Sequence, residues 1–87
     1  MVAIIALALQ GCGPSLSPLD QGIVLLSERD YPGAEQHFGE MLAENPEDPY
    51  ANLNMGVANA KLGDKVAAVR YYRAAIQYGQ AAEIKTT

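Results

Sequence analysis

Residues 50–58 read Tyr-Ala-Asn-Leu-Asn-Met-Gly-Val-Ala, and residues 62–64 read Leu-Gly-Asp. This stretch is the clearest part of an internal repeat whose two copies lie 34 residues apart with no gap. At that offset similar residues fall at the same position in six pairs: Leu19 and Leu53, Gly22 and Gly56, Asp30 and Asp64, Ala34 and Ala68, Phe38 and Tyr72, and Leu42 and Ile76. A period of this length is typical of stacked helix-turn-helix units. The sequence therefore predicts an all-α fold, with one repeat at residues 15–48 and a second at 49–82.

Each repeated position has a physical reason. A glycine midway along the first helix of a hairpin lets the second helix approach closely, and an alanine on that second helix is its small partner. An aromatic residue four positions later lies on the same helix face and would fill the gap between successive hairpins. An aspartate at the start of the second helix would accept backbone N–H bonds. These roles fall on Gly22 and Gly56, Ala34 and Ala68, Phe38 and Tyr72, and Asp30 and Asp64.

Proline, glycine and acidic residues indicate the helix boundaries. Acids and prolines suit the first turn of a helix, and glycine suits the turn that follows one. Gly63 fits the turn inside the second repeat, where the first repeat has Arg29. Gly79 indicates the end of the last helix. These signals predict helices near 16–29, 31–45, 49–62 and 64–78. A small polar tail is expected from Gln80 to Thr87, and its residues 83–87 lie beyond the second repeat.

The pattern resembles the tetratricopeptide repeat family over about 68 of the 87 residues. The resemblance implies a fragment of a right-handed α-solenoid that binds protein partners without catalysis. Two repeats are fewer than the three or so that such stacks normally need, and no capping helix is recognisable. The last helix is therefore expected to expose a flank at Val66, Val69 and Ile76. Further repeats, another copy of the chain or a partner would cover that flank.

In the family that the chain resembles, partners bind in a groove lined by the first helices of the repeats. The corresponding residues here are Leu19, Ile23, Leu26, Tyr50, Leu53, Asn54, Val57 and Lys61. This surface is mostly apolar, which favours an amphipathic protein or peptide partner over an acidic tail. The alternative is that part of this stripe belongs to the core. Asn52, Asn54 and Asn59 are either hydrogen-bond donors to a bound backbone or ordinary solvated side chains.

The N-terminal segment has a separate character. Val2 to Leu9 is apolar and too short to span a bilayer, but it matches the middle of a secretory signal peptide. No Lys or Arg precedes Arg29, so either the true start lies upstream or the signal interpretation fails. Residues 9–12, Leu-Gln-Gly-Cys, resemble the bacterial lipobox. That resemblance implies removal of residues 1–11, a lipid on Cys12 that holds the protein on a membrane, and a tether over 12–18. The alternative is an incidental cysteine.

Composition and motifs exclude several classes of protein. The net charge is -4, with -7 in residues 1–48 and +3 in residues 49–87, which disfavours a nucleic-acid partner. One cysteine excludes an internal disulfide. His37 stands among mobile acids and makes a poor metal ligand, so we expect a surface histidine, no metal and no cofactor. No phosphate loop, paired-histidine motif or nucleophile elbow is present, which argues against an enzyme. The cations Lys61, Lys65, Arg70 and Arg73 form either solvated faces or a patch for lipid headgroups or an acidic neighbour.

These observations lead to one hypothesis and two alternatives. The hypothesis is a non-catalytic interaction module of a bacterial envelope lipoprotein that scaffolds or recruits a partner in a pilus, secretion or cell-wall assembly. In the enteric lipoproteins that this segment resembles, an Asp after the lipidated cysteine favours retention in the inner membrane, so Gly13 at this position favours the outer membrane. The first alternative is a soluble cytosolic adaptor. The second is a structural repeat pair in a homo-oligomer without a separate ligand.

Overall fold

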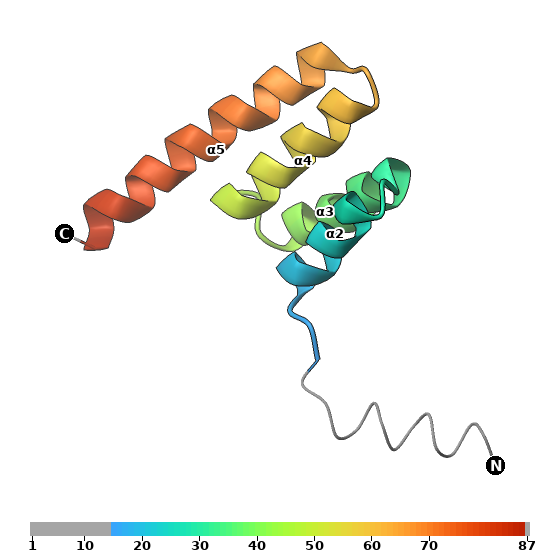
Figure 1. Cartoon of the computed structure of the whole chain (residues 1–87). Helices are drawn as coiled ribbons and strands as arrows, with labels where there is room; N and C mark the ends of the chain where they lie inside the picture. The colour runs from blue at the N-terminus through green and yellow to red at the C-terminus, as the bar shows by residue number, and fades with distance from the viewer. Residues whose placement is uncertain (1–14, 87) are drawn as a thin grey trace.

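The structure is a computed structural model that describes the backbone of residues 15–86 and the side chains through Glu83. All regular elements in this range are helices: α2 at Pro18–Ser27, α3 at Tyr31–Glu44, α4 at Pro49–Lys61 and α5 at Lys65–Thr86. They form two helical hairpins, α2–α3 and α4–α5 (Figure 1). The predicted all-α repeat fold is confirmed. The predicted signal segment and Cys12 lie outside the described residues.

Side-chain caps explain where the helices begin. The Ser17 hydroxyl accepts a hydrogen bond from the backbone N–H of Asp20 at 3.1 Å, directly before Pro18 opens α2. The two repeated aspartates act alike at the second helix of each hairpin. Asp30 Oδ1 accepts from the Gly33 N–H at 3.0 Å, and Asp64 Oδ1 accepts from the Ala67 N–H at 3.1 Å. The predicted capping role of both aspartates is confirmed.

The turns inside the two hairpins have the same backbone geometry. The Asp30 N–H donates to the Leu25 carbonyl at 2.9 Å, and the Asp64 N–H donates to the Asn59 carbonyl at the same distance. Each turn needs one residue with a positive φ, which is 63° at Arg29 and 90° at Gly63. An L-residue rarely adopts this conformation because its Cβ crowds the backbone. The first turn therefore keeps the geometry of the second, at the expense of strain at Arg29.

The core lies where α2, α3 and α4 meet. Its buried centre is formed by Ala34, Phe38, Met55 and Ala58. The glycines make this packing possible. A Cβ on Gly22 would lie 2.5 Å from Phe38 Cε1, and a Cβ on Gly56 would lie 2.6 Å from Tyr72 Cε1. Each repeated aromatic residue therefore packs onto the glycine of its own hairpin, so only a residue without a side chain fits at these two positions.

Helix α5 is longer than the sequence predicts. The first three helices agree with the predicted ranges to within two residues at each end, but α5 continues from Lys65 to Thr86. The predicted end near Tyr78 is therefore wrong. Gly79 has ordinary helical geometry rather than a positive φ, and Gln80, Ala81, Ala82 and Glu83 after it are compatible with a helix. The C-terminal part of α5 consequently extends beyond α4 (Figure 1).

The helices differ in how much of their surface is covered. Among the described elements α4 packs against α2, α3 and α5, whereas α5 packs against α4 alone. Within residues 15–86 no helix is both long enough and apolar enough to span a membrane. The one-sided packing of α5 leaves a surface that the next section describes.

Candidate protein-binding site

A groove lies between the start of α4 and the C-terminal half of α5. Its volume is about 720 Å³, and its lining is mostly apolar. Helix α4 contributes Pro49, Tyr50 and Leu53, and α5 contributes Tyr72, Ala75, Ile76, Gly79, Gln80, Ala82 and Glu83. We call this surface the α4–α5 groove.

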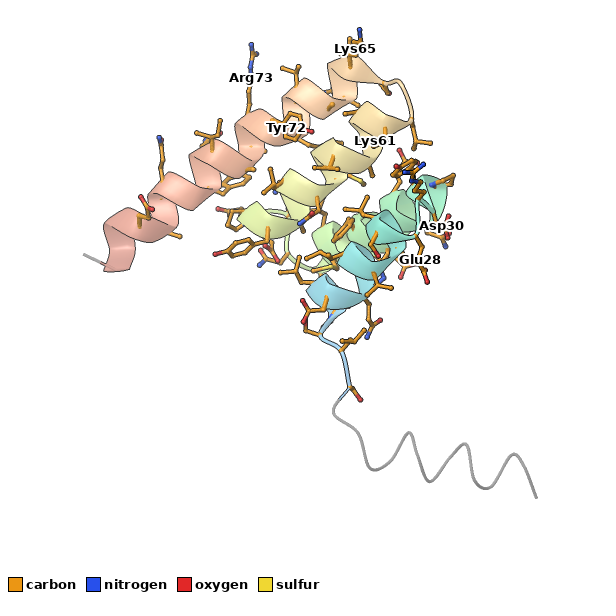
Figure 2. The ribbon with its side chains drawn as sticks, viewed as in Figure 1. Glu28, Asp30, Lys61, Lys65, Tyr72 and Arg73 are labelled. Carbon is orange, nitrogen blue, oxygen red and sulfur yellow. The ribbon has the colours of Figure 1, made fainter. Side chains whose placement is uncertain are left out.

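The groove exposes large hydrophobic side chains on both of its walls. Tyr50 is 62% exposed, Leu53 is 45% exposed and Ile76 is 61% exposed. Contiguous exposed apolar surface on a soluble domain marks a site of interaction with another molecule. Tyr72 lies at the base of the groove, and its side chain points from α5 toward α4 (Figure 2). The arrangement can bury an apolar stripe of another segment.

The binding residues predicted on the first helices of the two repeats do not share one surface in the structure. Leu19 and Leu26 are half-buried and pack against the core, as the alternative interpretation expects. Tyr50 and Leu53 line the α4–α5 groove, while Ile23 is exposed on α2. Three further predicted residues lie on α4 outside this groove: the half-buried Val57, the exposed Lys61, and Asn54, whose amide donates to the Tyr50 carbonyl at 2.9 Å. Only part of the predicted stripe is thus brought into one site.

Two asparagines are structural. The Asn52 amide donates to the carbonyls of Pro46 and Asp48 at 3.1 and 2.9 Å, and the Asn59 amide donates to the Met55 carbonyl at 2.9 Å. Both side chains are buried. Neither of the two interpretations from the sequence, donors to a partner or solvated groups, holds for them.

The three residues of the predicted flank on α5 lie on two different surfaces. Val66, Val69 and Ile76 are all exposed, but only Ile76 lines the α4–α5 groove. Val66 and Val69 lie in a second hollow on the outer side of α5, together with Lys65, Arg70 and Arg73. Lys65 and Arg73 project away from α4 (Figure 2). We call this surface the basic face. Its two valines are bordered by three cations.

His37 has a structural contact. Its Nε2 lies 2.6 Å from the Pro18 carbonyl oxygen, and its ring meets the Phe38 ring edge-on with centroids 5.7 Å apart. The side chain is half-buried and links α3 to the first turn of α2. In the described part of the chain, no three His, Cys, Asp or Glu side chains gather as metal ligands would.

The sequence interpretation missed most of the α5 wall of the groove. Gly79, Ala82 and Glu83 lie beyond the predicted helix end near Tyr78, and Ala75 lies inside the predicted helix but is not among the predicted binding residues. The repeat offset contains the missing signal. It relates Met41 and Leu42, which pack against the core, to Ala75 and Ile76, which line the groove.

Comparison with known proteins agrees with this geometry. A family model described as tetratricopeptide repeat matches residues 19–83, which cover nearly all of both hairpins. Neither a search of curated proteins nor a search of solved structures returned a match. Repeats of this family mediate binding between proteins and are typically non-catalytic. The chain belongs to the tetratricopeptide repeat family.

Proposed function

We propose that this chain is the protein-binding part of a lipid-anchored bacterial envelope protein, in which the α4–α5 groove recruits one amphipathic partner. The partner would belong to an envelope assembly of the pilus, secretion or cell-wall type. The lipid on Cys12 would hold the repeats at a membrane, the outer membrane by the argument from Gly13. The repeats would then present the groove to partners in the envelope.

One observation carries the binding proposal. Tyr50, Leu53 and Ile76 expose apolar side chains around one hollow, although the corresponding surface of the first hairpin is covered by α4. Burial of apolar surface contributes about 25 cal/mol per Å², so covering this groove would drive association. The same surface explains why an amphipathic partner suits the site better than a uniformly charged one.

A matched pair of substitutions tests the groove. Leu53→Glu places a charge inside the groove, whereas Leu62→Glu places it at the C-cap of α4, outside the groove. The two leucines are 45% and 43% exposed, so neither change introduces a charge into the core. We expect Leu53→Glu to abolish cross-linking to the partner in cells that make the protein, with unchanged helicity by circular dichroism. Leu62→Glu should retain both the cross-linking and the helicity of the unsubstituted protein. Undiminished cross-linking of Leu53→Glu would contradict the proposal.

The anchor is tested by intact mass. The protein is expressed with a complete signal start in a Gram-negative host, alongside a Cys12→Ala variant. We expect a species that begins at Cys12 and carries the added mass of diacylglycerol, and none in the variant. Two or three acyl chains would then anchor it stably. An unmodified chain that retains residues 1–11 would overturn the anchor and favour a soluble adaptor.

A structural role in a homo-oligomer is the second candidate, favoured by the exposed Val66 and Val69 on the basic face. It predicts concentration-dependent self-association that Val66→Glu abolishes. Light scattering on the purified protein checks this. A monomer at high concentration would exclude it.

A further inference from the structure

The internal repeat indicates what kind of segment fits the α4–α5 groove. In the first hairpin, α4 lies against α3, so Phe38 is fully buried and Leu42 packs against the core. The counterparts on α5 are Tyr72 and Ile76, and Ile76 is 61% exposed. A helix that lay on α5 as α4 lies on α3 would cover both residues. The surface of α3 that α4 covers therefore recurs on α5, one repeat later, where no helix of the described residues covers it.

Two differences between the repeats determine which side chains such a helix must carry. The Met55 methyl of α4 lies 3.4 Å from the position of a Cβ on Gly39, so Met55 packs over a residue without a side chain. The counterpart of Gly39 on α5 is Arg73, an exposed cation. In addition, the counterpart of Met41 on α5 is the smaller Ala75. This difference leaves room in the groove for a larger apolar side chain of the docked helix. A helix that covered α5 as α4 covers α3 would therefore meet Arg73, which lines the basic face rather than the groove, and would need a group that accepts this cation.

The charges around the site favour a carboxylate as that group. Lys65, Arg70 and Arg73 line the basic face on the outer side of α5, and none of them lines the groove itself. Glu83, at the far end of the groove, is the one acid among the described residues of α5. A carboxylate that meets an arginine forms a charge-assisted hydrogen bond, and complementary charge also selects among partners.

A second copy of the chain fits this site poorly. The buried face of α4 includes Ala51, Met55 and Ala58. At the repeat offset, the corresponding face of α2 carries Ser17, Gln21 and Val24, and the Gln21 amide donates to the Leu16 carbonyl at 2.9 Å. A face with two polar residues would replace the apolar one. Pairing α5 with α5 would bring the same cations together.

We propose that the α4–α5 groove docks one acidic amphipathic α-helix of a different protein. This helix lies where the first helix of a third repeat would lie, and it carries a carboxylate opposite Arg73. The proposal rests on the proposed protein-binding function and specifies the partner class for that site. The apolar stripe of the docked helix covers Tyr72 and Ile76 on α5 and Tyr50 and Leu53 on α4.

Helical peptides of defined charge test the proposal. The probe is a synthetic peptide with the sequence of residues 48–62, stapled on its exposed face so that it is helical in solution by circular dichroism. One version carries Met55→Glu and the other Met55→Lys. Binding to the full chain is measured by fluorescence anisotropy. We expect the Glu peptide to bind about fivefold more tightly than the Lys peptide, because one contact changes from attractive to repulsive.

Variants of the full chain locate the effect. Arg73→Glu should reverse the order of the two peptides. Arg70→Glu makes the same change in net charge, but its counterpart in the first hairpin is the exposed Gln36, so it should keep the original order. Ile76→Glu should weaken both peptides about tenfold or more, because it removes a central apolar contact.

Each outcome bears on the proposal. Failure of both helical peptides to bind, or an order that Arg73→Glu leaves unchanged, would overturn it. Self-association of the full chain that Ile76→Glu abolishes would also overturn it, with a second copy as the occupant. If Leu53→Glu abolishes partner cross-linking but the peptides show no charge order, the acidic-helix inference fails and the proposed function stands. If the peptides bind in the expected order but Leu53→Glu leaves cross-linking intact, the proposed function fails instead.

Discussion

The two hairpins share one plan but differ in what covers their second helix. Both place an aromatic residue on a glycine, both cap the second helix with aspartate, and both turns contain one residue with positive φ. Yet Phe38 is fully buried between hairpins, whereas Tyr72 lines an open groove. Position in the stack, rather than the residue itself, decides whether a repeated aromatic side chain belongs to the core or to a binding surface.

The largest expected effect comes from truncating the two aromatic residues. Phe38→Ala should lower the free energy of unfolding by about 3–5 kcal/mol, because a fully buried ring leaves a cavity. Tyr72→Ala should lower it by about 1–2 kcal/mol, because that side chain is only partly buried and is covered on one side. Urea unfolding followed by circular dichroism measures both values. Equal losses would show that the two hairpins are covered alike.

The glycines beneath these rings provide the next comparison. Gly22→Ala should destabilise the fold by about 2–3 kcal/mol, because the new methyl overlaps a ring that is enclosed on all sides. Gly56→Ala should destabilise it by about 1–2 kcal/mol, since the Tyr72 ring can turn into the groove and only the Ala68 carbonyl oxygen, 3.2 Å from the new methyl, must give way. Thermal unfolding of the two variants orders them. A greater loss for Gly56→Ala would contradict the one-sided cover of α5.

The turn residues should respond in opposite directions. Arg29→Gly should raise the free energy of unfolding by about 1 kcal/mol, because it relieves an L-residue at a φ of 63°. Gly63→Ala should lower it by about 1 kcal/mol, although no atom within 4 Å would touch the new methyl. Urea midpoints of both variants check the signs. Destabilisation by Arg29→Gly would show that the Arg29 side chain stabilises the turn.

The smallest effect concerns the continuity of α5. Gly79→Ala should stabilise the chain by about 0.5–1 kcal/mol, because Gly79 is helical and an added Cβ would lie 3.8 Å from the Pro49 Cβ, in ordinary contact. Helicity should rise slightly in the same sample. A loss of stability would indicate that α5 bends or ends at Gly79, as the sequence suggests.

The repeat made much of the fold predictable. The paired glycines, alanines and aspartates each had one physical explanation, and all lie where that explanation places them. The end of α5 was not predictable in the same way, because glycine is compatible both with a helix end and with a helix interior. Only the backbone at Gly79 distinguishes the two.

The binding site was only partly predictable, since burial depends on neighbours that one helix does not reveal. Leu19 and Leu53 are counterparts in the repeat, yet the first packs against the core and the second lines the groove. Arg29 was recognised as a departure from the turn glycine. Its positive φ follows only from the geometry that the two turns share.

Native-state hydrogen exchange of the isolated chain tests the central claim most directly. Amides of matched positions are compared: Phe38 with Tyr72, Met41 with Ala75, and Leu42 with Ile76. A helix covered on one side opens at a lower free energy than one covered on both. We expect each α3 amide to exchange only through global unfolding and each α5 partner to exchange faster, through a smaller opening. Equal protection of the two helices would contradict the account, because the α4–α5 groove would then not be an uncovered face.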